Sequence, residues 1–214
     1  MAETHPRIER QNRLFTLADN QAGYFTAHQA LELGYAYQYQ QHHRQTGAWL
    51  EVGRGLFRLR DYPSSDTEEL VRLSLWSHNR AGIAQAVVSH ATALELYELS
   101  DLMPNRKYLT VPPGFRKAPL PGVELHRAIL EPSEVETRVG YRITTPLRTL
   151  LDLAQTPFNP EHLESAVGQT LERGLVRQRK LLEAIETLND TPKNIKARDR
   201  LLFALEGSRA LVTR

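Results

Sequence analysis

The amino-acid sequence predicts an α+β protein with two domains, residues 1–61 and residues 62–214. Three observations support this prediction. A short capped helix, a polar helix and an alternating hairpin come first, a Tyr62-Pro-Ser-Ser65 break follows, and apolar strands then alternate with helices. A chain of 214 residues is long enough for two small domains. Its content of 41% hydrophobic and 24% charged residues is typical of a soluble globular protein.

Several protein classes are excluded by composition. No run approaches 18 apolar residues, so we expect no membrane-spanning segment and no membrane partner. The segment Met1–Arg13 is polar and lacks the apolar centre of a signal peptide. The absence of cysteine rules out disulfides and thiolate metal sites and fits a cytoplasmic location, which we expect for this protein.

The first domain begins with three expected helices. The first covers Ile8–Asp19, with Ile8, Leu14, Phe15 and Ala18 directed toward a core. Thr26 starts the second, because its hydroxyl can accept from the first turn and Gln29 completes a capping box; Gly34 is the expected stop. The third covers Tyr37–Gln45, closes at Thr46 and Gly47, and contains no aliphatic residue, so packing alone does not explain it.

A β-hairpin is expected directly after the polar helix. The strands Trp49–Val52 and Leu56–Arg60 alternate with period two and flank Gly53-Arg54-Gly55, whose glycines permit a tight turn. Between Gly34 and Arg60 there are four arginines and one acid, Glu51. Helix-turn-helix followed by a hairpin is the arrangement of a winged-helix DNA-binding domain, and a basic helix and wing support that interpretation over a merely solvated basic surface.

This arrangement predicts which side chains contact DNA. Amide and guanidinium groups on the third helix would reach base edges in the major groove, and Arg54 at the hairpin tip would enter a narrow minor groove. Arg58 would contact the phosphate backbone or the minor groove. The predicted DNA-binding residues are Thr26, Tyr37, Gln38, Gln41, His42, Arg44, Arg54 and Arg58.

The second domain is expected to mix strands and helices. Asp66 caps a helix with Glu68 and Glu69 in its first turn and with Leu70, Leu73 and Trp76 on one face. Ser89 caps a helix that carries Leu94 and Tyr97, and Thr145-Pro146 starts another. The expected strands are 84–88, 107–111, 123–130 and 141–144, and the later helices are 160–173, 176–188 and 193–205.

Six segments together resemble the AbiEi family of antitoxins. Those that resemble its C-terminal domain are Val88–Leu96, Tyr108–Pro112, Gly122–Arg127 and Ile143–Asp152, and those that resemble its winged helix are His43–Trp49 and Gly53–Leu59. Phe57 stands where family members commonly have tyrosine. The resemblance implies a repressor that binds inverted repeats in its own operon, with a pair of protomers on the repeat. It also implies a partner, a nucleotidyltransferase-like toxin that is neutralised without a stable complex.

No catalytic, cofactor or metal site is predicted. His42 and His43 lack a third ligand nearby, so we expect one ring to pack against the first helix and the other to face DNA. Adjacent Ser89 and His90 should point in different directions, which favours capping over catalysis. His126 and Asp152 are interpreted as isolated, satisfied core groups. A nuclease is disfavoured because no Asp-x-Lys or Glu-x-Lys pair occurs.

The second domain carries one basic cluster that could contact a partner. Its residues are Arg173, Arg177, Arg179 and Lys180. A solvated helix face explains this cluster about as well as a toxin or RNA contact does. Two alternatives to an antitoxin therefore stay open: a winged-helix regulator that acts without a toxin, and a protein-interaction module.

Overall fold

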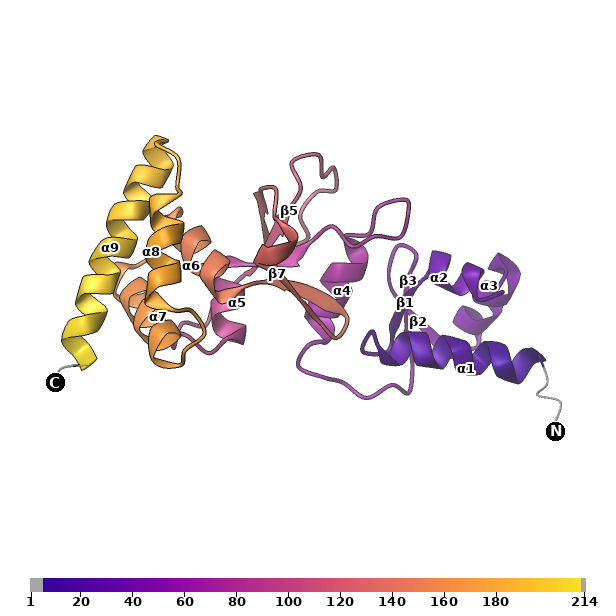
Figure 1. Cartoon of the computed structure of the whole chain (residues 1–214). Helices are drawn as coiled ribbons and strands as arrows, with labels where there is room; N and C mark the ends of the chain where they lie inside the picture. Colours follow the sequence, from indigo (N-terminus) through magenta and orange to yellow (C-terminus); the bar gives the residue numbers. More distant parts are fainter. Residues whose placement is uncertain (1–5, 213–214) are drawn as a thin grey trace. The chain divides into compact units, whose positions relative to one another are not determined.

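The computed structural model describes residues 6–212 and has a mixed α+β fold with helices and two β-sheets (Figure 1). Backbone contacts divide the chain into two compact units. The first runs up to Ala86 and includes Thr137–Tyr141; the second contains Val87–Glu136 and the chain from Arg142 onward. Residues 62–86, which the sequence assigned to the second domain, are thus grouped with the first unit.

In its described part, the first unit combines four helices with a small antiparallel sheet of strand order β1-β3-β2. The polar helix and the hairpin lie where the sequence predicts them, whereas the three-residue strand β1 was not predicted. The elements are α1 (Pro6–Asp19), β1 (Tyr24–Thr26), α2 (Ala27–Glu32), α3 (Tyr37–Gln45), β2 (Trp49–Gly53), β3 (Leu56–Leu59) and α4 (Glu68–Trp76).

An aromatic core holds α1, α2 and the sheet together. Phe25 is fully buried, and its ring centroid lies 4.8 Å from that of Trp49 and 5.8 Å from that of Phe57. Helix α1 adds buried Leu14 and Ala18 to this core, as expected. The expectation for Ile8 and Phe15 was wrong, because they are 52% and 54% exposed. Neither lies on the narrow stripe of α1 that meets the core.

A second apolar cluster attaches α4 to the small sheet. Val71 and Leu75 of α4 are buried with Tyr24 and Leu56, and Tyr141 packs against them. The prediction that Asp66 caps α4 was wrong by one residue. Thr67 occupies the N-cap and makes no side-chain capping bond. The apolar face of α4 is the reason that the first unit continues beyond the break at residues 62–65.

The second unit contains most of a five-stranded sheet of order β6-β5-β4-β8-β7. Strand β4 is antiparallel to β5 and parallel to β8, and β5 is parallel to β6. The predicted strand 84–88 is reduced to two residues, and β7 was not predicted. The elements are β4 (Val87–Val88), α5 (His90–Leu96), β5 (Lys107–Val111), β6 (Val123–Arg127), η1 (Pro132–Glu134), β7 (Val135–Arg138) and β8 (Tyr141–Thr144).

Four helices complete the second unit: α6 (Pro146–Ala154), α7 (Pro160–Glu172), α8 (Gln178–Glu186) and α9 (Pro192–Val212). Helix α6 starts as predicted, with Pro146 in its first turn and the Thr145 hydroxyl accepting from the Arg148 amide. Helices α7 and α9 lie side by side (Figure 1) and bury apolar residues, including Leu163 and Leu201. No helix in residues 6–212 has the length and apolar character needed to cross a bilayer.

Candidate nucleic-acid interface

The inner face of α3 is anchored by a buried glutamine and a stacked histidine. Gln40 is 3% exposed, and its Nε2 donates to the carbonyl oxygens of Ala27 at 3.0 Å and Tyr35 at 2.8 Å. The His43 ring stacks on Trp49, with centroids 4.7 Å apart. Burial lowers the pKa of His43, and the neighbouring charge of His42 acts in the same direction. These contacts fix the rotation of a helix that has no aliphatic side chain.

The outer face of α3 presents polar side chains to solvent. Tyr37, Gln38, Gln41 and His42 are all exposed, and Tyr37 reaches 69%. These are four of the side chains that the sequence predicts for base contacts. Of the two histidines, His43 packs inward and His42 is exposed, but His42 lines the hollow on the α1 side of α3 and not the groove beside the hairpin. His43 stacks on Trp49, however, whereas the sequence expected a ring packed against the first helix.

A groove of about 800 Å³ separates α3 from the β2–β3 hairpin. Tyr37, Gln41 and Arg44 line its helical side, and Glu51 and Phe57 line its sheet side. Arg44 forms an ion pair with Glu51, and its guanidinium carbon lies 5.9 Å from the centre of the Phe57 ring. The ion pair restricts the guanidinium to the groove, where an arginine held in one orientation can recognise a planar acceptor pair.

Arg54 occupies the tip of the hairpin. Gly53 pairs with Leu56, so that Arg54 and Gly55 form a two-residue turn in which Gly55 adopts a φ of +67°. A positive φ at this position favours glycine and closes the turn tightly. Arg54 is exposed and makes no hydrogen bond or ion pair with the described residues 6–212. Its guanidinium is available to an external anion.

Arg58 and Thr26, two of the predicted contacts, are used inside the first unit. The Arg58 side chain is 12% exposed, donates to the Tyr62 carbonyl at 2.7 Å and approaches Glu68 at 3.5 Å. Thr26 caps α2: its Oγ1 accepts from the Gln29 amide at 3.1 Å, and Gln29 Oε1 accepts from the Thr26 amide at 2.8 Å. The capping box is confirmed. Both side chains have structural partners, so we leave them out of the candidate interface.

Two residues of the basic cluster 173–180, Arg173 and Arg179, are engaged within their own unit. Arg173 Nη1 donates to the carbonyl oxygens of Tyr97 at 2.6 Å and Glu98 at 3.2 Å, and it thereby satisfies the end of α5. Arg179 pairs with Glu183 at 2.8 Å on the surface of α8. Arg177 is the N-cap residue of α8, and Lys180 is exposed. The four residues therefore have separate surroundings.

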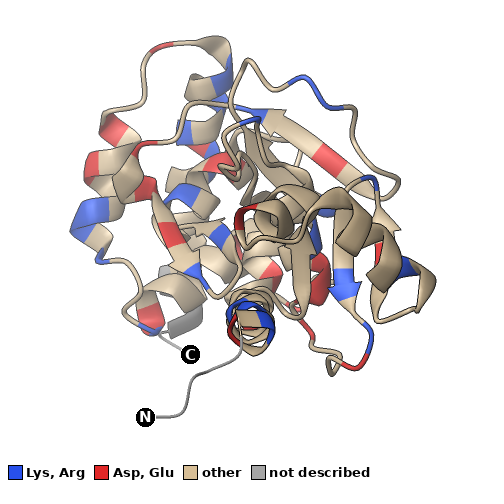
Figure 2. Ribbon diagram, turned by 90° about the vertical axis from the view of Figure 1, so that its right-hand side faces the viewer, with Lys and Arg blue, Asp and Glu red and all other residues tan. Residues whose placement is uncertain are grey.

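Basic and acidic residues are interspersed along the ribbon (Figure 2). The formal net charge of the chain is only +2. Attraction to a polyanion therefore depends on local groups such as Arg54, because the charge of Arg44 is offset by Glu51 and the total charge supplies little long-range steering.

Ser89 and His90 differ from their sequence-based interpretation. The Ser89 side chain makes no capping bond to α5; it accepts from Thr110 Oγ1 at 2.8 Å and lies 2.9 Å from His90 Nδ1. The two side chains therefore point toward each other, which His90 permits by adopting a φ of +51°. Ser89 is fully buried. It cannot meet a substrate as a nucleophile without a rearrangement of the strand end.

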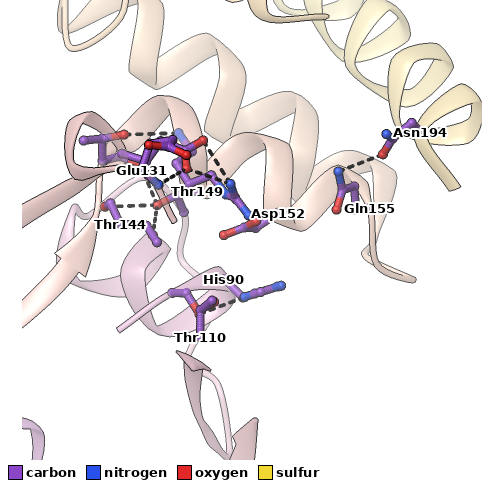
Figure 3. Close-up of polar contacts among 12 residues, drawn as sticks. His90, Thr110, Glu131, Thr144, Thr149, Asp152, Gln155 and Asn194 are labelled. Atoms are coloured by element: carbon purple, nitrogen blue, oxygen red, sulfur yellow. Dashed lines mark hydrogen bonds and ion pairs between the residues drawn. The ribbon is translucent and has the colours of Figure 1, made fainter. Parts of the chain in front are cut away.

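His126 and Asp152 are neither isolated nor fully satisfied, contrary to expectation. The ring of His126 stacks on that of His90 with centroids 3.7 Å apart, and its Nε2 lies 3.7 Å from Glu124, too far for a hydrogen bond. Asp152 accepts from Arg148 at 2.8 Å through Oδ1, while its buried Oδ2 has no partner in the described chain. Figure 3 shows His90 beside Thr110, and Asp152 on α6.

Burial shifts the proton affinities of this polar cluster. Burial lowers the pKa of His90 to about 3, and nearby His126 and Lys193 act in the same direction. Burial raises the pKa of Asp152 to about 6 against the opposing charge of Arg148. In the part of the chain that the structure describes, no three His, Asp or Glu side chains come together as a metal site. At neutral pH the His90 imidazole is therefore uncharged, and the Asp152 carboxylate, paired with Arg148, is ionised.

Comparisons with known proteins bear on the fold. No family model matches the sequence, and no curated protein does. Among solved structures, the crystal structure of the RV2827C protein from Mycobacterium tuberculosis is similar, with a TM-score of 0.60 and 15% sequence identity. The similarity covers 94% of this chain and 79% of that one. At this identity the likeness concerns the arrangement of helices and strands and carries no activity across.

Proposed function

We propose that the chain is a sequence-specific DNA-binding repressor whose first unit is a winged helix. One observation supports this most strongly: α3 faces solvent with Tyr37, Gln38 and Gln41, and beside it Arg54 projects from a tight hairpin turn. A helix of this kind fits the major groove, and an exposed hairpin arginine fits the adjacent backbone or minor groove. Arg44, held in the groove by Glu51, supplies a guanine-reading group.

The resemblance to AbiEi antitoxins extends the proposal to a biological role. In this role the chain represses its own operon through inverted repeats and counteracts a nucleotidyltransferase-like toxin in the cytoplasm, without acting as an enzyme. The antitoxin part rests on the resemblance alone. The DNA-binding part also rests on the exposed face of α3, and it can be tested without knowledge of the toxin.

Titration of the full-length protein with its own promoter fragment tests DNA binding. We expect tighter binding to the promoter than to scrambled DNA. We also expect the slope of log affinity against log salt concentration, the salt slope, to become shallower by about 0.9 for each phosphate contact removed. Arg54→Ala should flatten this slope on every sequence. Gln41→Ala should leave the slope unchanged and cost about 1–3 kcal/mol at one base pair.

Arg80→Ala is the matched control, because Arg80 is also an exposed loop arginine of the first unit but lies outside the groove residues. This variant should bind like the unchanged protein. If the Arg54 and Arg80 variants lost DNA affinity equally, the loss would depend only on the net charge of the protein, and the proposed interface would be contradicted. Equal binding to promoter and scrambled DNA would contradict a specific repressor.

A further inference from the structure

A second hollow of the first unit lies on the other side of α3. Its volume is about 910 Å³, and residues from α1, α3, the start of β2 and the segment after β3 line it. This volume lies within the range of small-molecule sites, which are mostly apolar with a few placed polar groups. The DNA-reading face proposed above does not include this cavity.

Aromatic rings form the walls of the cavity. Tyr35, His43 and Trp49 pack against one another with centroid separations of 4.7 to 5.6 Å. Phe15 and Tyr39 also line the cavity, yet they are 54% and 53% exposed. Two half-exposed rings beside a cavity offer faces on which a planar ring can stack, an arrangement that favours binding beyond simple burial.

Arginines give the cavity a positive character. The Arg10 guanidinium lies 4.8 Å from the ring centre of Tyr35 and 5.2 Å from that of Tyr39, and its Nη1 donates to the Gly34 carbonyl. Its buried Nε has no hydrogen-bond partner in residues 6–212. Arg7 and Arg60 also line the cavity, against two aspartates, of which Asp19 already accepts from the Tyr62 hydroxyl at 2.8 Å.

We propose that this cavity binds a planar aromatic anion, with its ring between Phe15 and Tyr39 and its anionic group at Arg10. Exposed aromatic faces select a flat ligand, and the Arg10 guanidinium, which lines the cavity, selects an acceptor that carries negative charge. An aromatic carboxylate and a nucleoside monophosphate share this chemistry. The two sources differ in ring size and in the charge of the anionic group, so a titration can separate them.

Occupancy of the cavity bears on α3 directly. Tyr39, His42 and His43 line the cavity, while Tyr37 and Gln41 of the same helix line the groove toward the hairpin. A ligand that packs against the cavity side of α3 therefore stabilises one orientation of the helix. That orientation also sets the positions of the side chains on the groove side. This coupling, unlike the binding itself, rests on the proposed DNA-binding function.

Tryptophan fluorescence of the full-length protein tests the binding. Trp49 lines the cavity and Trp76 is the second of two tryptophans, so a Trp76→Phe background leaves one reporter. The probes are benzoate and adenosine 5′-monophosphate, with benzamide, adenosine and inorganic phosphate as matched partners that lack either the charge or the ring. We expect saturable quenching by at least one of the two aromatic anions and at least tenfold weaker binding of its partners.

Variants locate the site. Arg10→Met and Phe15→Ala should each weaken the binding of the aromatic anion about tenfold, which corresponds to about 1.4 kcal/mol. Arg13 is also an exposed residue of α1, but it does not line the cavity, so Arg13→Met should bind the aromatic anion like the unchanged protein. Because Phe15 is half-exposed, its variant remains informative if Arg10→Met fails to fold.

No saturable change with either anion up to about 10 mM, or equal affinity in the folded Phe15 and Arg13 variants, would overturn the proposal. Promoter titration with and without the bound probe then tests the coupling. A change of promoter affinity supports regulation through α3. Probe binding without such a change would leave the site standing and contradict the coupling, whereas loss of promoter binding in all conditions would contradict the proposed repressor only.

Discussion

Two adjacent glutamines of α3 have different roles. Gln40 is buried and bonds two carbonyl groups, whereas Gln41 is exposed beside the groove. Gln40→Ala leaves both carbonyl oxygens without that donor, so we expect a loss of about 2 kcal/mol of stability in urea denaturation. Gln41→Ala should change stability by less than about 0.5 kcal/mol and affect DNA binding instead.

Comparison of Gln40→Ala with Gln41→Ala distinguishes a residue that stabilises the fold from one that is proposed to contact DNA. If Gln41→Ala proved as destabilising as Gln40→Ala, the two faces of α3 would be misassigned. The sequence shows that this helix is too polar to pack in the usual way. It does not show which glutamine turns inward, because that depends on the carbonyls of Ala27 and Tyr35, which come from other segments.

At the scale of elements, α5 and α6 carry two buried groups with opposing effects on acid stability. The pKa of His90 falls from 6.5 unfolded to about 3 folded, so stability is lost as pH drops below 6.5. The pKa of Asp152 rises from 3.8 unfolded to about 6 folded, so stability is gained as pH drops below 6. Between pH 7 and pH 5 the first effect amounts to about 2 kcal/mol of loss and the second to about 1 kcal/mol of gain.

Substitution should reveal each contribution. Relative to the unchanged protein, Asp152→Asn should lose about 1 kcal/mol more stability between pH 7 and pH 5, since the compensating proton uptake is gone. Asparagine tolerates the positive φ of residue 90, so His90→Asn should fold. Between pH 7 and pH 5 this variant should lose about 2 kcal/mol less stability than the unchanged protein. Urea denaturation at both pH values measures the difference. Identical pH dependence in all three proteins would show that these groups titrate alike in the folded and unfolded states.

Elements with local signals could be predicted from the sequence. The capping box at Thr26, the hairpin around Arg54 and strand β5 needed only neighbouring residues to be recognised. Strand β1 could not be predicted, because its three residues pair with β3 residues that lie 30 to 34 positions away. The stacking of His90 on His126 escaped prediction for the same reason. The internal use of Arg58 was also missed, although Tyr62 lies only four positions away, because the sequence does not show the bend that turns the Tyr62 carbonyl toward Arg58.

At the scale of the whole molecule, the extent of the first unit determines which fragment can fold and can therefore serve to test the proposed DNA binding. Val71 and Leu75 of α4 are buried against Tyr24 and Leu56, which belong to the small sheet. A fragment that ends at residue 61 exposes that face of the sheet. Since each large aliphatic side chain contributes about 1.5–3 kcal/mol on burial, removal of α4 costs several kcal/mol, a large part of the stability of a small domain.

We therefore expect residues 1–86 to fold and bind promoter DNA, and residues 1–61 to be markedly less stable. Thermal unfolding by circular dichroism measures the first property, and promoter titration measures the second. Val71→Ala in the 1–86 fragment should lower its unfolding temperature, because it trims the same contact without shortening the chain. Equal stability of the two fragments would show that residues 1–61 form a complete domain, in agreement with the boundary expected from the sequence. A stable 1–86 fragment that fails to bind while the full chain binds would show that DNA recognition also requires residues from the second unit.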